Sequence, residues 1–130
     1  MEDSEFSEIV FNLKSDDPEV VAEAAENLQA RSTREDAPKL LELLNDPDFV
    51  IREAAAWSLS DFAGPEVLPN LLSALQRGYD EGLDNDGLQS AISDLVMMNK
   101  ESSKAKLHLM AEGADEIMRE HIKWLLEFCE

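Results

Sequence analysis

Few side chains in this sequence have the chemistry of a reactive centre. The candidates are two histidines, His108 and His121, and the single cysteine Cys129. A catalytic cysteine needs a base close by, and Cys129 has none near it in the sequence. We expect His108 to be a partly buried core residue, because its position is apolar in the other repeats described below. The sequence therefore predicts no catalytic residue, and one cysteine excludes an intramolecular disulfide or a cysteine zinc cluster.

The acidic stretch 78–87 has the composition of a calcium loop, with three glycines and four carboxylates. A helix-loop-helix calcium site needs oxygen ligands at fixed offsets from its glycine. With the last glycine of the stretch in that place, Gly82 takes the first ligand position and Ser93 the last. The sequence therefore predicts no metal site, and we expect a flexible loop in which Asp84 or Asp86 caps the next helix.

Two tryptophans are the most informative side chains for binding. An Arg-Glu-x-x-x-Trp-x-Leu string occurs twice, over residues 52–59 and 119–126, and places Trp57 and Trp124 two residues before a leucine expected in the core. Exposed aromatic anchors dominate many protein interfaces. Equally, each ring can fold over a neighbouring helix as ordinary packing, and the apolar end of the chain around Trp124 can pack internally or mediate a dimer.

These strings lie in a repeating pattern of helices. Phe6, Ile9, Val10 and Leu13 follow the i, i+3, i+4, i+7 spacing of an amphipathic helix, and the pair Asp17-Pro18 starts a second helix. Both helices recur 31 residues later, so that Leu40 matches Ile9 and Ile51 matches Val20, and a Pro-x-Leu-Leu-x-x-Leu string recurs at the same offset, over 38–44 and 69–75.

The third pair contains an insertion. Leu88 lies 17 residues after Leu71, whereas Val20 lies 11 residues after Ile9. We place the extra residues as an inserted loop within 78–87, because repeat arrays carry insertions on one face. The sequence thus predicts a single domain, 1–130, of four helix pairs at about 4–31, 33–63, 65–98 and 100–128.

The second helix of the second pair resembles that of a HEAT repeat. Asp46-Pro47 is followed by Ile51-Arg52-Glu53-Ala54-Ala55-Ala56-x-x-Leu59, and the spacing is that of the short, bacterial, lyase-like variety. The resemblance covers essentially the whole chain. It implies an all-α fold, a right-handed α-solenoid of about four antiparallel helix pairs whose second helices line the concave side. It also implies that Arg52 and Arg119 bond to an acidic or backbone group of a neighbouring unit.

The same register predicts an acidic strip beside the tryptophans on the concave side. Such a strip with aromatic anchors suits a basic protein surface, although the alternative is that the carboxylates are ordinary solvated helix faces. Tyr79 and Leu83 of the acidic stretch are a second candidate contact. The predicted partner-binding residues are Trp57, Trp124, Glu23, Glu26, Glu53, Asp61, Asp94, Glu120 and Glu127.

Enzymes of this architecture use residues that the chain lacks. HEAT-like iron hydroxylases carry His-Glu dipeptides in successive repeats, whereas this chain has only the reverse order, Glu120-His121. HEAT-like DNA glycosylases hold DNA on a basic face, whereas this chain has 29 acidic and 11 basic side chains and a formal net charge of −18. Such a surface repels phosphate backbones and anionic lipid.

We therefore predict a non-enzymatic protein-binding module, without cofactor or metal, whose partner is a basic protein and neither nucleic acid nor membrane. Its sharper form is an acidic inhibitor or immunity protein that masks a toxin or nuclease. The alternative is a HEAT-like accessory or lyase-like protein that holds a small molecule or a substrate protein, and a homodimer through the C-terminal helix is a further hypothesis. Because no apolar run approaches the ~20 residues of a membrane span, we expect a cytoplasmic protein.

Overall fold

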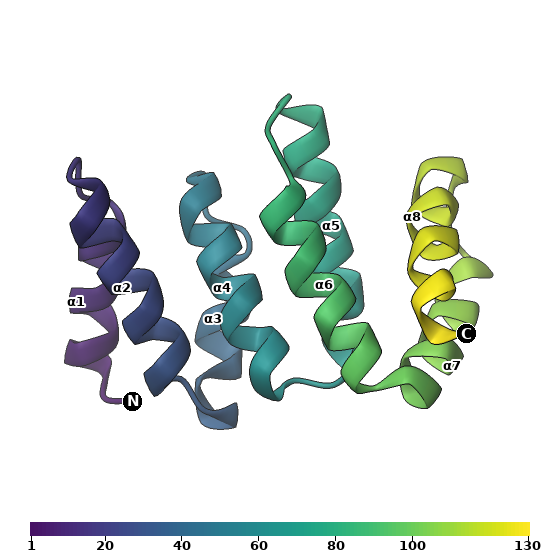
Figure 1. The fold of residues 1–130 in the computed structure, drawn as a ribbon, viewed down its shortest axis with the longest axis horizontal. Helices are drawn as coiled ribbons and strands as arrows, with labels where there is room; N and C mark the ends of the chain where they lie inside the picture. Colours follow the sequence, from purple (N-terminus) through teal and green to yellow (C-terminus); the bar gives the residue numbers. More distant parts are fainter. The chain divides into compact units, whose positions relative to one another are not determined.

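The computed structural model describes residues 1–130 and contains eight α-helices and no strand (Figure 1). Three short 3-10 turns, η1 (Arg34–Asp36), η2 (Pro65–Val67) and η3 (Glu127–Cys129), lie between or after them. The prediction of an all-α fold of four helix pairs is confirmed. The pairs are α1 (Asp3–Leu13) with α2 (Pro18–Arg31), α3 (Ala37–Leu43) with α4 (Phe49–Phe62), α5 (Leu68–Asp80) with α6 (Asp86–Met98), and α7 (Lys100–Ala111) with α8 (Glu116–Leu126).

The helices form two compact units, the N-terminal unit Met1–Phe62 and the C-terminal unit Ala63–Glu130, with two pairs in each. In the N-terminal unit, α2 packs against both α1 and α4. In the C-terminal unit, α6 packs against α5 and α7, and the final turn η3 contacts α6, α7 and α8. The second helices of neighbouring pairs therefore lie side by side in the N-terminal unit, and α6 reaches the end of α8 through η3 in the C-terminal unit.

In the N-terminal unit, local signals start the helices and small residues bring them together. The side chain of Asp17 accepts a hydrogen bond of 3.0 Å from the backbone N–H of Glu19, and Pro18 occupies the first turn of α2. Ala24 on α2 and Ala55 on α4 are buried, which lets the two helices approach closely while leucines fill the space around them.

The arginines of the repeated string bond to backbone carbonyls that precede their own helices. Arg52 is fully buried, and its Nη1 donates to the carbonyls of Asp46 at 2.9 Å and Pro47 at 3.1 Å. Arg119 is exposed, and its Nε donates to the carbonyl of Ala111 at 3.4 Å. Each of these bonds ties a second helix to the connection or helix before it in the same pair, and the bond to Asp46 agrees with the expectation of a backbone partner near the start of the helix.

The insertion in the third pair lengthens a helix. α5 has 13 residues where α3 has seven, so Gly78, Tyr79 and Asp80 are helical where we expected a flexible loop. The connection 81–85 is closed by hydrogen bonds, from the Leu83 N–H to the Gly78 carbonyl at 3.0 Å and from the Asn85 side chain to the Leu83 carbonyl at 2.9 Å. Asp84 accepts from the Asp86 N–H at 3.0 Å, but the N-cap position of α6 is Asn85, so neither of the two expected residues is the N-cap.

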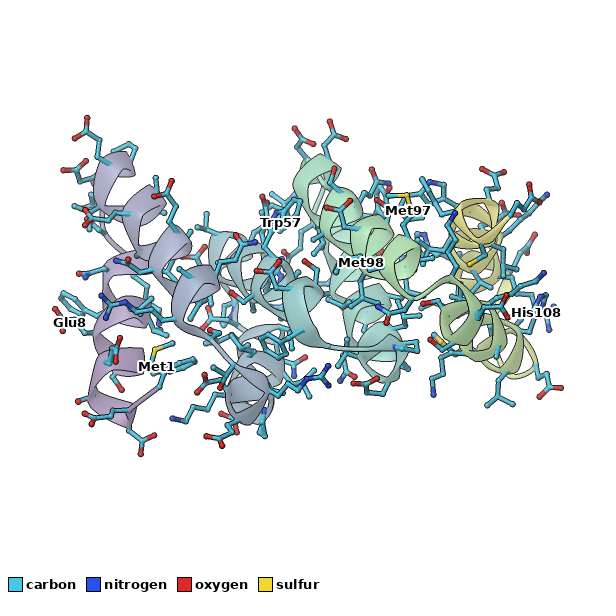
Figure 2. The ribbon with its side chains drawn as sticks, turned by 60° about the horizontal axis from the view of Figure 1, so that its bottom comes forward. Met1, Glu8, Trp57, Met97, Met98 and His108 are labelled. Carbon is cyan, nitrogen blue, oxygen red and sulfur yellow. The ribbon has the colours of Figure 1, made fainter.

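Two core assignments in the last pair are wrong. Leu125 is fully buried, whereas Leu126, the leucine of the repeated string, is only half-buried. His108 is exposed at the edge of α7 and the adjacent Leu107 is fully buried, so the predicted core histidine is a surface residue (Figure 2). Leu107 and Ile122, which stand at the register positions of Leu71 and Ala55, are buried, so α7 and α8 keep the register of the earlier repeats and the errors concern single residues.

Candidate protein-binding site

The N-terminal unit carries an apolar groove between α2 and α4. Its volume is about 160 Å³, and its walls are Ala25 of α2 and Val50, Glu53, Ala54 and Trp57 of α4. The α4 residues are spaced at i, i+3, i+4 and i+7, so one face of the helix presents them together. Trp57 is half-buried at this wall and projects from α4 (Figure 2). Trp57 therefore lines a groove, and its side chain is neither fully exposed nor fully packed against a neighbouring helix.

Of the carboxylates predicted around Trp57, Glu53 lines the groove. Asp61 is exposed and accepts a hydrogen bond from Nε2 of Gln29 at 3.3 Å, which joins the ends of α4 and α2. Glu23 and Glu26 are exposed on α2 and do not line the groove. Sequence reasoning missed the apolar wall made by Val50 and Ala25, because the helix pattern does not show which residues of α2 and α4 face each other across a groove.

The C-terminal unit carries a larger and more polar groove of about 420 Å³. Trp124 forms one wall, and the ring of Phe128 stands edge-on to it at 5.6 Å between centroids and 88°. The predicted carboxylates Asp94, Glu120 and Glu127 are exposed but do not line this groove. The opposite wall consists of residues spaced at i, i+3, i+4 and i+7 on α6, which sequence reasoning missed: Asp86, Gln89, Ser90 and Ser93.

Tyr79 belongs to a cluster that joins α5, α6 and α8. Its ring stacks on that of His121 at 5.6 Å and 9°, and its hydroxyl accepts a hydrogen bond from the side chain of Gln89. Nε2 of His121 lies 2.7 Å from Oε1 of Gln76, and because an amide oxygen only accepts, the ring donates. Periodicity could not have found this cluster, since its members meet only after α8 packs. Leu83, the other loop candidate, is exposed.

Burial shifts the pKa of His121 and of Cys129, two of the side chains first considered for catalysis. Desolvation lowers the pKa of His121 from its ordinary value, while the Asp115 carboxylate opposes this shift. Burial raises the pKa of the Cys129 thiol, against the opposing charges of Lys104 and Lys100. A thiol held in its neutral form is a weak nucleophile.

The chain offers no group of three or more His, Cys, Asp or Glu side chains placed to hold a metal ion. None of its helices combines the length and the apolar character that a membrane crossing requires.

Comparison with known proteins gives one result. A family model described as HEAT repeats matches residues 8–91, which is more than half of the chain and runs from α1 into α6. This match confirms the resemblance found in the sequence. No curated protein and no solved structure matches the chain.

Proposed function

We propose a function from the premise that this chain belongs to the HEAT-repeat family: it is a non-enzymatic protein-binding module for a basic protein partner. HEAT repeats commonly mediate protein–protein interaction and generally act as non-catalytic scaffolds. A role as a binding scaffold follows from the family. The basic partner and the groove that holds it are proposed from the side chains of this chain.

The observation that carries the proposal is the half-buried Trp57 in the groove between α2 and α4. The groove is wide enough for an apolar side chain of a partner, and Val50, which is 43 % exposed, forms its rim. An indole that already has one face packed loses little conformational entropy when a partner covers the other face. This is the environment in which an interface anchor contributes most.

Charge selects the kind of partner. The N-terminal unit carries 16 acidic and 5 basic side chains, and Glu53 lies within the groove itself. Arg31 and Lys39 already form ion pairs with Glu5 and Asp3, and Arg52 is buried, so the surface potential of the unit is strongly negative. A negative surface accelerates association with a positive one and disfavours acidic competitors.

The sharper form of the proposal is an inhibitor or immunity protein that covers the basic active face of a toxin or nuclease. It is supported by the acidity of the chain and by the small size of the groove, which suits one inserted side chain rather than a substrate. If the partner is an enzyme, addition of one equivalent of this protein should abolish its activity.

Affinity capture from the native cell tests the proposal when variants are compared in parallel. Trp57→Ala and Glu53→Lys should each weaken capture of a basic protein by at least about tenfold, as interface anchors do. Phe11→Ala is the matched aromatic control, because Phe11 is 77 % exposed on α1 and lies outside the groove. Glu42→Lys, at an exposed position on α3, is the matched charge control.

The captured protein is then purified and its affinity for each variant measured directly. Selective loss with Trp57→Ala and Glu53→Lys supports the groove as the binding site. Equal affinity of all four variants rejects the groove, and an acidic captured partner rejects the charge argument. A coloured small molecule that co-purifies with the protein would favour the accessory-protein alternative instead.

A further inference from the structure

The Trp124 groove of the C-terminal unit has the components of a site for arginine. The Trp124 ring is the largest side chain in its wall, and the edge-on contact with Phe128 fixes the orientation of that ring. Tryptophan is the aromatic residue that attracts cations best, and the planar guanidinium of arginine stacks on such a face more often than the ammonium of lysine does.

The opposite wall supplies acceptors that have no partner within the chain. Asp86 is the one charged residue of the lining, and its carboxylate forms no hydrogen bond or ion pair. Gln89 donates its side-chain N–H to the hydroxyl of Tyr79, which leaves its carbonyl oxygen available. Because Tyr79 is in turn stacked on His121, the orientation of Gln89 is fixed by the aromatic cluster.

The length of the groove fits a short extended segment. From Asp86 to Ser93 it follows seven residues of α6, which correspond to roughly 10 Å at the rise of an α-helix. Three residues of extended chain span about the same distance. In an extended chain the side chains at i and i+2 point to the same side, about 7 Å apart, so two of them can enter one groove.

We infer that this groove binds an extended Arg-x-Arg segment of a protein partner, with one guanidinium on the face of Trp124 and the other beside Asp86. The inference deepens the proposed function and depends on it only for the premise that the ligand is a protein. The α2–α4 groove would hold an apolar side chain, whereas this groove would bind two positively charged side chains.

Trp124 itself reports on binding, because the chain has only two tryptophans. In a Trp57→Phe background, Trp124 is the single source of indole fluorescence, and it is titrated with the pentapeptide Gly-Arg-Ala-Arg-Gly. The control peptide carries citrulline at both arginine positions and keeps the shape while removing the charge. We expect a saturable change in Trp124 fluorescence with the arginine peptide and binding at least about tenfold weaker with the citrulline peptide.

Asp86→Asn should weaken the arginine peptide by about tenfold, since it removes the one charge in the lining. Glu116→Gln is the matched control, because Glu116 lies in the first turn of α8 as Asp86 lies in the first turn of α6. Circular dichroism verifies that both variants fold.

The inference is overturned if Trp124 fluorescence shows no saturable change, if the citrulline peptide binds as well as the arginine peptide, or if the two variants bind the arginine peptide equally well. Failure here leaves the Trp57 results untouched, because the peptide signal comes from the C-terminal unit alone.

Discussion

The two tryptophans occupy the same position of one repeated string and yet have different neighbours. Trp57 faces alanine and valine side chains in its groove, whereas Trp124 faces serine, glutamine and aspartate. The difference arises in the preceding second helix, since α2 offers Ala25 where α6 offers polar residues. A repeated residue therefore does not imply a repeated ligand, and the helix on the other side of the groove decides what is bound.

Replacement of His121 should change how stability depends on pH. Burial lowers its pKa below the ordinary value of 6.5, so the unfolded chain binds a proton more readily than the folded chain. The neutral ring therefore contributes stability above pH 6.5 that is lost as the pH falls through the lower pKa of the folded state. The free energy of unfolding, measured by urea denaturation at about pH 7.5 and 5.5, should fall less between the two pH values for His121→Gln than for the unmodified protein.

His108→Gln provides the control for this prediction, because His108 is the other histidine and is exposed. It should leave the pH dependence unchanged. If both substitutions alter the slope equally, the effect belongs to net charge and not to the burial of His121. The comparison between variants removes the general effect of acid on a chain of this charge.

At the scale of single residues, the sequence predicted which residues are buried in the core better than it predicted which side chains contact them. The 31-residue register assigned Leu28, Ile51 and Leu59 to the core, and all three are fully buried. It was wrong for His108, which is exposed, and for Leu126, which is only half-buried, although Leu107 and Ile122 at the register positions of the same helices are buried. Periodicity identifies a helix face, but it does not identify which residue across a groove will face it.

At the scale of elements, the main departure from the repeat is the length of α5. The added turns bring Gly78 into the last turn of the helix, where the side chain of Asn85 closes over it. A Cβ at Gly78 would lie 2.0 Å from Oδ1 of Asn85 and 2.9 Å from its Cγ. Glycine, which usually weakens a helix, is here required because it lets the start of α6 approach α5.

Gly78→Ala should therefore destabilise the protein by about 1–3 kcal/mol, because Asn85 is buried and cannot move away without disturbing its bond to Leu83. Without that contact, alanine would stabilise a helix relative to glycine by up to about 1 kcal/mol. Gly113→Ala is the control, since a Cβ at Gly113 meets no atom within 4 Å. The midpoint of thermal unfolding should therefore fall for Gly78→Ala, whereas it should stay the same or rise for Gly113→Ala. A stabilised Gly78→Ala would show that Asn85 does not pack against this glycine.

The insertion also shows why the element could be predicted only in part. The count of extra residues and their position near the glycines followed from the register. Their helical conformation did not, because three glycines in ten residues indicate a loop on composition alone. Only Gly82 has a positive φ, of 71°, and it lies in the connection after α5, so one glycine serves a turn and another serves close packing.

At the scale of the whole molecule, both units are acidic. The C-terminal unit carries 13 acidic and 6 basic side chains, beside 16 and 5 in the N-terminal unit. Within each unit the like charges repel, and folding holds them closer together than an unfolded chain would. Acidity thus favours binding to a basic partner but lowers the stability of the isolated protein. A bound basic surface would reduce the repulsion and raise that stability.

Sodium chloride should consequently raise the stability of the isolated protein while weakening its binding to a basic partner. The Debye length falls from about 30 Å at 0.01 M to about 8 Å at 0.15 M, which screens the repulsion summed over a net charge of −18. The same salt also weakens exposed ion pairs such as Arg31–Glu5 and Arg77–Glu81, but such pairs contribute only about 0–1 kcal/mol each. We therefore expect the repulsion to dominate and the midpoint of thermal unfolding to rise between these two salt concentrations.

A midpoint that falls would mean that the ion pairs contribute more than the repulsion. Partner binding that does not depend on salt would argue against electrostatic recognition, even if Trp57 proves to be an anchor.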